Sequence, residues 1–257
     1  MTATTGAGVQ AVVIVAMADE AAPFLELAGV TGGVAPGEGI VPDDAAPAET
    51  GAGVSQAVGA AEHTIVELGG RRVALVRSGI GFVNAAGAAV GALLTYGTVP
   101  VISAGSAGGL DASVAVGDVV VGRTYVNTGA DATAFGYRLG QVPGMPAVYA
   151  ADPGLLEAAS AAGAGQDQKV LAGTIGSSEQ FVTTSLAETL RVAFDQVLAV
   201  DMESAAIAQA CHNHGAPFVA IRGVSDLCAP DGTEFLTHVD DAALRSARVV
   251  TAALAGL

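Results

Sequence analysis

Acidic residues follow three separate apolar runs of the sequence, near the points where we expect strands to end. Asp19 and Glu20 follow "AVVIVAM", Asp201 and Glu203 lie just after "QVLAV", and Asp226 ends "APFVAIRGVSD". A carboxylic acid in a protected site can protonate a leaving group, and an ionised carboxylate can orient an attacking water. Because ligands bind at the carboxyl ends of strands in open α/β sheets, we expect these acids to meet at one edge of a sheet.

The same residues also have purely structural interpretations. Asp226 could serve as the N-cap of a following helix, and Glu20 could simply favour the N-terminus of one. Met17 and Met202, which lie beside the acids, could be ordinary core residues. The sequence alone leaves a catalytic and a structural role open for each of them.

A glycine-rich stretch, "SAGSAGGLD" (residues 103–111), is a further candidate for ligand contact because it follows another apolar run. Its small residues would let a ligand approach the backbone, whose amides could donate hydrogen bonds. A purely structural turn is an equally good interpretation, since glycine-rich turns after strands are common. The stretch matches neither GxGxxG nor GxxxxGK[ST], so it supports neither a dinucleotide site nor a P-loop.

Apolar runs alternate with alanine-rich helical patterns along the chain, and this alternation positions the acids. Residues 63–79 are expected to form a β-hairpin that turns at Gly69-Gly70. The alternation predicts an α/β domain with a mostly parallel sheet covered on both faces. Strands are expected at 11–16, 99–105, 116–129, 169–178, 196–202 and 216–226, and helices at 19–28, 82–97, 152–164, 185–194, 203–215 and 240–257.

The length allows one large domain or two small ones, and we expect a single compact domain over residues 1–257. Hydrophobic residues make up 51% of the chain and charged residues 14%, which is typical of close helix–sheet packing and not of disorder. Residues 31–60 are rich in Gly, Pro and Ala, and we predict a mobile surface excursion there.

The charge and cysteine content exclude several classes of partner. The net charge is −15 and the sequence has no basic run, so neither a nucleic-acid polymer nor an anionic membrane is an expected partner. Cys211 and Cys228 form no zinc-like spacing with the histidines, so we expect free thiols and no metal. No apolar stretch approaches the roughly 18 residues of a membrane helix, and the N-terminus lacks the positive region of a signal peptide. A cytoplasmic protein is expected.

Several ordered motifs together resemble the purine nucleoside phosphorylase/uridine phosphorylase superfamily. They are "IVAMADE", "SAGSAGGL", "VGDVVV", "ADATAFGY", "GSSEQFV" and "VDMESAAIAQACHNHGAPFVAIRGVSD", and the similarity spans residues 10–256 in the same order. Within the superfamily the sequence is most similar to the 5′-methylthioadenosine/S-adenosylhomocysteine nucleosidases. The resemblance implies a three-layer α/β/α sandwich around a central mixed, mostly parallel sheet, and a homodimer. It also implies that water cleaves an N-glycosidic bond without a cofactor, releasing adenine and a 5-thioribose sugar.

The resemblance assigns roles to individual residues. Glu20 would activate the attacking water, and Asp226 would protonate N7 of the purine, whose edge Ser225 also contacts. Glu203 would hold the ribose hydroxyls. The other residues expected to bind the nucleoside are Met17, Ser106, Gly108, Phe181, Val182 and Met202. A pocket for the 5′-substituent, partly across the dimer interface, would be formed by Phe135, Tyr137 and Pro143. Arg222 and Asp201 would support the carboxylates.

Hydrolysis is favoured over phosphorolysis, and other activities remain open. A phosphate dianion is usually bound by arginines, and the superfamily's phosphorylases commonly have one just before the glycine-rich turn, where this chain has Ser103 and Ala104. Ser178 and Glu179 in "SSEQFV" and Asp201 in "VDME" depart from the related nucleosidases, which typically have "SGDAFV" and "VEME". A nucleosidase for a futalosine-type nucleoside, a phosphorylase, and a nucleoside-binding protein without activity are the alternatives.

Overall fold

The computed structural model describes residues 8–30, 55–164 and 168–257. The α-helices are α1 (Ala18–Leu27), α2 (Phe82–Tyr96), α3 (Pro153–Gly163), α4 (Thr184–Ala193), α5 (Ser204–His214) and α6 (Thr233–Gly256), and a short 3-10 helix, η1, covers Thr133–Phe135. The strands are β1 (Ala11–Val15), β2 (Ser55–Val58), β3 (Ala61–Leu68), β4 (Arg71–Arg77), β5 (Val101–Gly109), β6 (Val119–Asn127), β7 (Tyr149–Ala150), β8 (Val170–Ser177), β9 (Val197–Asp201) and β10 (Phe218–Asp226).

The strands with continuous apolar runs form the centre of the sheet. All five residues of β1 and all nine of β10 are buried, as expected for strands covered on both faces. β1 pairs in parallel with β4 and β5. The predicted hairpin is confirmed: β3 and β4 are antiparallel, and Gly69 and Gly70 adopt φ angles of 57° and 75° at the turn.

The sheet closes on itself, which the alternation of strands and helices did not predict. β5 pairs with β9 and β10, and β6 and β8 complete a ring in the order β5, β10, β6, β8, β9. Of the ten pairings between the described strands, five are parallel and five antiparallel. The sheet is therefore mixed, as expected, but it is not mostly parallel, and part of it is a closed barrel.

The closure depends on the glycine-rich stretch, most of which is strand, so the interpretation of the stretch as a purely structural turn is wrong. β5 continues to Gly109, and Gly108 and Gly109 pair with Val200 and Ala199 of β9. Glycines in a strand commonly mark a bend or a close approach of another backbone. A Cβ atom at Gly109 would lie 2.8 Å from the side chain of Leu227, so a larger residue would not fit there unless that side chain moved.

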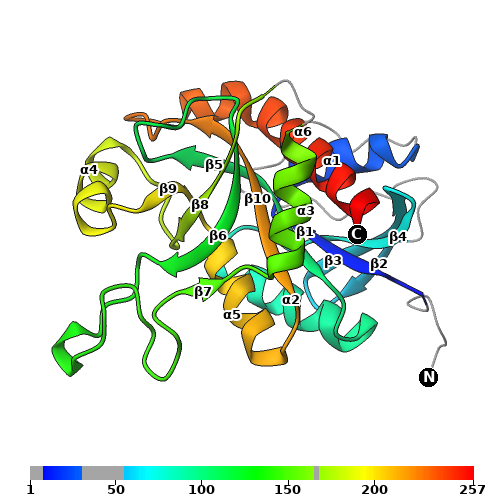
Figure 1. The fold of residues 1–257 in the computed structure, drawn as a ribbon, viewed down its shortest axis with the longest axis horizontal. Helices are drawn as coiled ribbons and strands as arrows, with labels where there is room; N and C mark the ends of the chain where they lie inside the picture. Colours follow the sequence, from blue (N-terminus) through cyan, green and yellow to red (C-terminus); the bar gives the residue numbers. More distant parts are fainter. Residues whose placement is uncertain (1–7, 31–54, 165–167) are drawn as a thin grey trace.

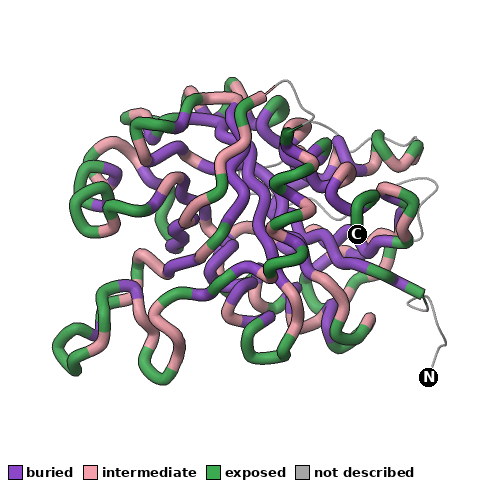
Figure 2. The backbone as a smooth tube through the Cα atoms, in the orientation of Figure 1, coloured by how far each residue is buried: buried purple, intermediate pink, exposed green. Residues whose placement is uncertain are grey.

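Helices cover both sides of the sheet. α1, α3 and α6 pack together on one side, and α2 packs against α5 on the other (Figure 1). The buried residues run through the central strands between these two groups (Figure 2). α6 begins at Thr233, seven residues before the predicted start at 240, and its added first turn includes Phe235.

Most of the predicted excursion, residues 31–54, falls outside the described residues, but Ser55–Val58 at its end form the edge strand β2. The chain between β6 and β7 extends away from the body of the molecule (Figures 1 and 2).

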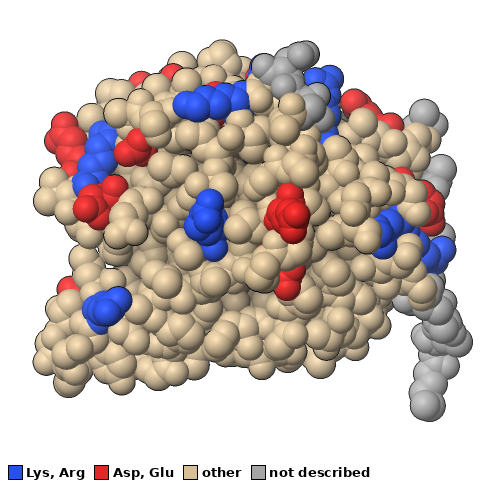
Figure 3. Space-filling view, viewed as in Figure 1, with Lys and Arg blue, Asp and Glu red and all other residues tan. Residues whose placement is uncertain are grey.

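No helix in the described part of the chain is both long and apolar enough to cross a membrane. On the face shown in Figure 3, most basic side chains stand apart, with uncharged surface between them.

Candidate active site

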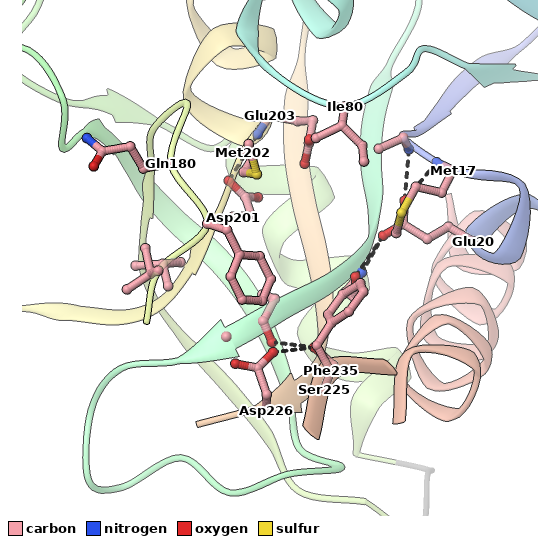
Figure 4. Close-up of a pocket in the computed structure, with 17 residues that line it drawn as sticks. Met17, Glu20, Ile80, Gln180, Asp201, Met202, Glu203, Ser225, Asp226 and Phe235 are labelled. Atoms are coloured by element: carbon pink, nitrogen blue, oxygen red, sulfur yellow. Dashed lines mark hydrogen bonds between the residues drawn. The ribbon is translucent and has the colours of Figure 1, made fainter. Parts of the chain in front are cut away.

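The predicted acids meet in one pocket at the ends of β1, β5, β9 and β10. The cavity has a volume of about 80 Å³. Figure 4 shows Glu20 at one side, Asp226 at the bottom, and Glu203 with Met202 at the top. The residues lining it are Ala16, Met17, Glu20, Ile80, Ser106, Ala107, Gly108, Gln180, Phe181, Val182, Val200, Asp201, Met202, Glu203, Ser225, Asp226 and Phe235.

Glu20 serves both a structural and a site role. It is buried in the first turn of α1, where its Oε2 accepts hydrogen bonds from the backbone N–H groups of Ala16 (2.8 Å) and Met17 (3.3 Å). Its Oε1 accepts from the backbone N–H (2.8 Å) and the hydroxyl (2.9 Å) of Ser106 on β5. An ionised carboxylate is an acceptor only, so these four donors suit that form.

Gly105 makes room for this carboxylate. Its φ angle is 139°, and a Cβ atom there would lie 2.2 Å from Oε1 of Glu20. Any other residue at this position would displace the carboxylate from β5, in addition to straining the backbone.

Asp226 ends β10 in different surroundings. Its Oδ1 accepts from the backbone N–H of Cys228 (2.9 Å), which adopts a φ of 59°, and its Oδ2 lies 2.8 Å from the Ser225 hydroxyl. Burial raises the pKa of Asp226 and outweighs these two hydrogen bonds, which lower it. The N-cap of α6 is Gly232, so Asp226 does not cap that helix, and the structural alternative for this residue is wrong.

Glu203 belongs to a buried ionic cluster around Arg222. The Arg222 side chain is 1% exposed and forms ion pairs with Asp201 (2.9 Å) and Glu203 (3.5 Å). Asp201 also accepts hydrogen bonds from the Ser177 hydroxyl (2.5 Å) and the Ser204 hydroxyl. Asp201 thus holds the guanidinium in place, and the Nη2 atom of Arg222 contacts Glu203.

The proton affinity of Glu203 is raised in this setting. Burial raises its pKa from the ordinary value of 4.5 to about 8. Arg222 and the N–H of Gly81, which donates to Oε1 at 3.1 Å, oppose this shift, whereas the charges of Asp201 and Glu20 add to it. Two carboxyl groups, those of Asp201 and Glu203, are paired with one guanidinium, and the charge of Glu20 acts on Glu203 from nearby, so this balance raises the proton affinity of Glu203.

We expect the stability of the protein without ligand to depend on pH through Glu203. The pKa of Glu203 is higher in the folded than in the unfolded chain, so its contribution to stability is present below about pH 4.5 and is lost as the pH rises through about 8. Glu203→Gln, which does not titrate, should therefore gain on the order of 2–4 kcal/mol relative to wild type between about pH 5 and about pH 9. Urea unfolding at both pH values measures this, and a difference that does not change with pH would contradict it.

The remaining walls of the pocket are mostly apolar, with Gln180 as a polar exception. Phe181 and Val182 come from the loop after β8, and the Phe181 ring meets the Phe235 ring edge-on, with centroids 5.7 Å apart. Our reading of the sequence missed Phe235 and Ile80. Ile80 lies three residues after the end of β4 and could have been found by the same strand-end rule, whereas Phe235 lies before residue 240, where the sequence pattern of α6 was predicted to begin.

Three predicted residues are not in the pocket of this chain. Phe135 is 83% exposed, Pro143 is exposed and Tyr137 is partly exposed. They belong to the segment between β6 and β7 that extends from the body of the molecule (Figure 1). Their predicted role at a partner's site stays a prediction.

Comparisons with known proteins agree with this geometry. Residues 10–255 match the family described as the phosphorylase superfamily. The chain is 42% identical over 186 residues to the 5′-methylthioadenosine/S-adenosylhomocysteine nucleosidase of Anoxybacillus flavithermus, which covers 71% of this chain and 80% of the relative.

Solved structures extend the similarity to nearly the whole chain. The nucleosidase of the same name from Neisseria meningitidis, in complex with methylthio-immucillin-A, matches with a TM-score of 0.84 and 36% identity, covering 96% of this chain and 99% of that one. The futalosine hydrolase of Helicobacter pylori matches with a TM-score of 0.82 and 25% identity, covering 97% and 99%. The chain belongs to the phosphorylase superfamily and, within it, to the family of the 5′-methylthioadenosine/S-adenosylhomocysteine nucleosidases.

Proposed function

We propose that this protein hydrolyses the N-glycosidic bond of 5′-methylthioadenosine- and S-adenosylhomocysteine-type nucleosides, releasing adenine and a 5-thioribose sugar. The observation that carries the proposal is the contrast between Glu20 and Asp226 in one pocket. Glu20 accepts four hydrogen bonds, whereas burial raises the pKa of Asp226. A carboxylate held as a hydrogen-bond acceptor beside the cavity is suited to take a proton from water, and a buried carboxyl group with a raised pKa is suited to donate one.

The proposed reaction delivers a proton to the leaving base on one face of the sugar and removes a proton from water on the opposite face. Asp226 donates its proton to N7 as the glycosidic bond breaks, so adenine leaves neutral and the sugar becomes oxocarbenium-like. Water adds to the anomeric carbon from the opposite face while Glu20 takes its proton, as in inverting glycoside hydrolysis. Exchange with solvent then returns a proton to Asp226 and removes one from Glu20.

The other pocket residues bind the nucleoside in this scheme. Glu203 accepts hydrogen bonds from the ribose hydroxyls, and Met202 packs on the sugar. Phe181 stacks on the base and Val182 offers its backbone to the adenine edge. Hydrogen bonds to the ribose that strengthen as positive charge develops would lower the barrier as well as bind the substrate.

Water is a better nucleophile than phosphate for this pocket. Arg222 is committed to protein partners: beyond its two ion pairs, it donates to the Ser103 hydroxyl (2.7 Å) and the Ala104 carbonyl (3.3 Å). A phosphate dianion beside Glu20 would also meet like charge. The test is adenine release from methylthioadenosine in phosphate-free buffer. Strict dependence on added phosphate would overturn hydrolysis in favour of phosphorolysis.

A futalosine-type substrate is the second candidate. The observation that favours it is the similarity to the futalosine hydrolase of Helicobacter pylori. A substrate panel compared by kcat/KM separates the two candidates. Tight nucleoside binding with no turnover of any substrate would instead indicate a binding protein on this fold.

We further propose a homodimer in which the segment between β6 and β7 reaches the partner's pocket. Phe135 is 83% exposed, and aromatic side chains are enriched in protein–protein interfaces. Phe135→Ala should raise KM for methylthioadenosine by roughly tenfold while leaving the affinity for adenine, which has no 5′ group, unchanged. Steady-state kinetics, calorimetry with adenine and sedimentation velocity test this. A monomeric wild type, or an equal loss for both ligands, would contradict it.

A further inference from the structure

One contact joins two rims of the pocket that come from distant parts of the chain. The loop of residues 178–182, after β8, contributes Phe181 and Val182, and the turn after β4 contributes Ile80. Glu179 in the loop connects them, because its Oε1 accepts a hydrogen bond of 2.9 Å from the backbone N–H of Phe82, the first residue of α2.

The start of α2 explains why an acid is held there. No side chain at its N-cap, Gly81, satisfies the first N–H groups of the helix, and these groups carry a partial positive charge that attracts carboxylates. Two successive amides bind two different acids: Gly81 donates to Glu203 at 3.1 Å, and Phe82 donates to Glu179. One acid comes from the proposed ribose site and the other from the wall proposed to contact the base.

Gly81 allows this close approach. Its φ is 93°, and a Cβ atom at this position would lie 2.6 Å from Oε2 of Glu179. The Glu179 carboxylate therefore lies directly over the turn that precedes α2. On the other side of the pocket, the Phe181 ring rests edge-on against Phe235 of α6. The loop thus spans the pocket between α2 and α6.

We propose that Glu179 is a positioning residue that caps α2 and thereby holds the 178–182 loop closed over the bound nucleoside. The inference rests on the proposed function, because it assigns Phe181 and Val182 to the base. Loss of the cap frees the loop, so the base is held less tightly. The acid, the attacking water and the ribose contacts are not moved, so the chemical step is preserved.

Glu179→Ala is expected to raise KM for methylthioadenosine by about three- to tenfold with kcat within about twofold of wild type, the range for one exposed hydrogen bond. The affinity for adenine, measured by calorimetry, should fall by a similar factor. Glu179→Gln keeps an acceptor oxygen and should restore most of both. A cap with a structural role alone would lower Tm without changing KM or the adenine affinity.

Phe82 offers a matched pair of variants that tests the hydrogen bond itself. Phe82→Ala removes the ring and keeps the N–H, whereas Phe82→Pro removes the ring and the N–H at a helix position that accepts proline. Glu179→Ala should weaken adenine binding in the Phe82→Ala background and have no further effect in the Phe82→Pro background. Circular dichroism checks that all variants fold.

The outcomes separate this inference from the proposed function. A wild type without nucleosidase activity would overturn the function, and adenine binding would still test the Glu179 contact. Wild-type KM and adenine affinity in folded Glu179→Ala would overturn the inference and leave the function intact. Equal effects of Glu179→Ala in both Phe82 backgrounds would also overturn it.

Discussion

Asp226→Asn is expected to lower kcat for methylthioadenosine by about 10²–10⁴-fold, the usual contribution of a general acid. Asparagine has nearly the same shape, and its carbonyl oxygen can still accept the 2.9 Å hydrogen bond from the Cys228 amide. It can also donate a hydrogen bond to N7, so substrate binding should change little. It cannot transfer a proton to the leaving adenine, so the loss should fall on kcat.

The pH dependence identifies the proton concerned. Because burial raises the pKa of Asp226, the wild-type enzyme keeps this proton to a higher pH than a free carboxyl would, and its rate should fall as the pH rises through that pKa. This fall should be absent from the residual activity of the variant. Ser225→Ala is the control, since it removes the neighbouring hydroxyl and keeps the acid. An Asp226→Asn enzyme with near-normal kcat would rule out the role of general acid.

Glu20→Gln should reduce kcat by a similar factor of about 10²–10⁴, because an amide cannot take a proton from water. It should also destabilise the fold. The carboxylate accepts hydrogen bonds from Ala16, Met17 and twice from Ser106, and a glutamine presents an NH₂ group to some of these donors. Buried donors left without an acceptor cost about 1–3 kcal/mol each, so Tm should fall as well.

Separating the two effects requires a control that keeps the carboxylate. Ser106→Ala removes one of the four hydrogen bonds and leaves both the charge and the Ser106 backbone donor in place. Its loss of kcat should be far smaller than that of Glu20→Gln when both are assayed well below their Tm values. If Glu20→Gln retains the wild-type rate under these conditions, Glu20 is not the base.

Local sequence patterns were sufficient to predict most elements and the acids of the site. Residues 11–16 and 216–226 are continuous apolar runs, and they form β1 and β10 with only small differences at their ends. Asp152 before Pro153 indicated the start of α3, and its Oδ1 accepts from the backbone N–H groups of Gly154 and Leu155, 3.0 Å in each case. Such signals lie within a few residues of the feature that they predict.

Features that depend on distant pairing could not be predicted in this way. The extension of β5 through Gly109 requires β9 as a partner about 90 residues later, and the glycines alone are equally consistent with a turn. Phe235 lies in the pocket because α6 begins at Thr233, seven residues before its predicted start, in a segment with no strong helical periodicity. In our proposal Phe135 contacts the pocket of a second copy of the chain, and local sequence patterns carry no information on contacts between two copies.

In the proposed mechanism, the closed ring of strands positions the two reacting carboxyl groups, whereas segments outside the ring contact the parts of the substrate that do not react. Ser106, which binds Glu20, and Gly108, which pairs with Asp226, both lie on β5, and β5 pairs with β10 in a continuous register up to Val224. The spacing of Glu20 and Asp226, the proposed base and acid, is thus set by backbone pairing inside the barrel. Residues 178–182 and the segment between β6 and β7 lie outside that pairing. Libraries randomised in the segment between β6 and β7 should yield enzymes with new 5′-group preferences, and libraries in residues 178–182 should change the affinity for the base, whereas libraries in β5 or β10 should mostly yield inactive enzymes.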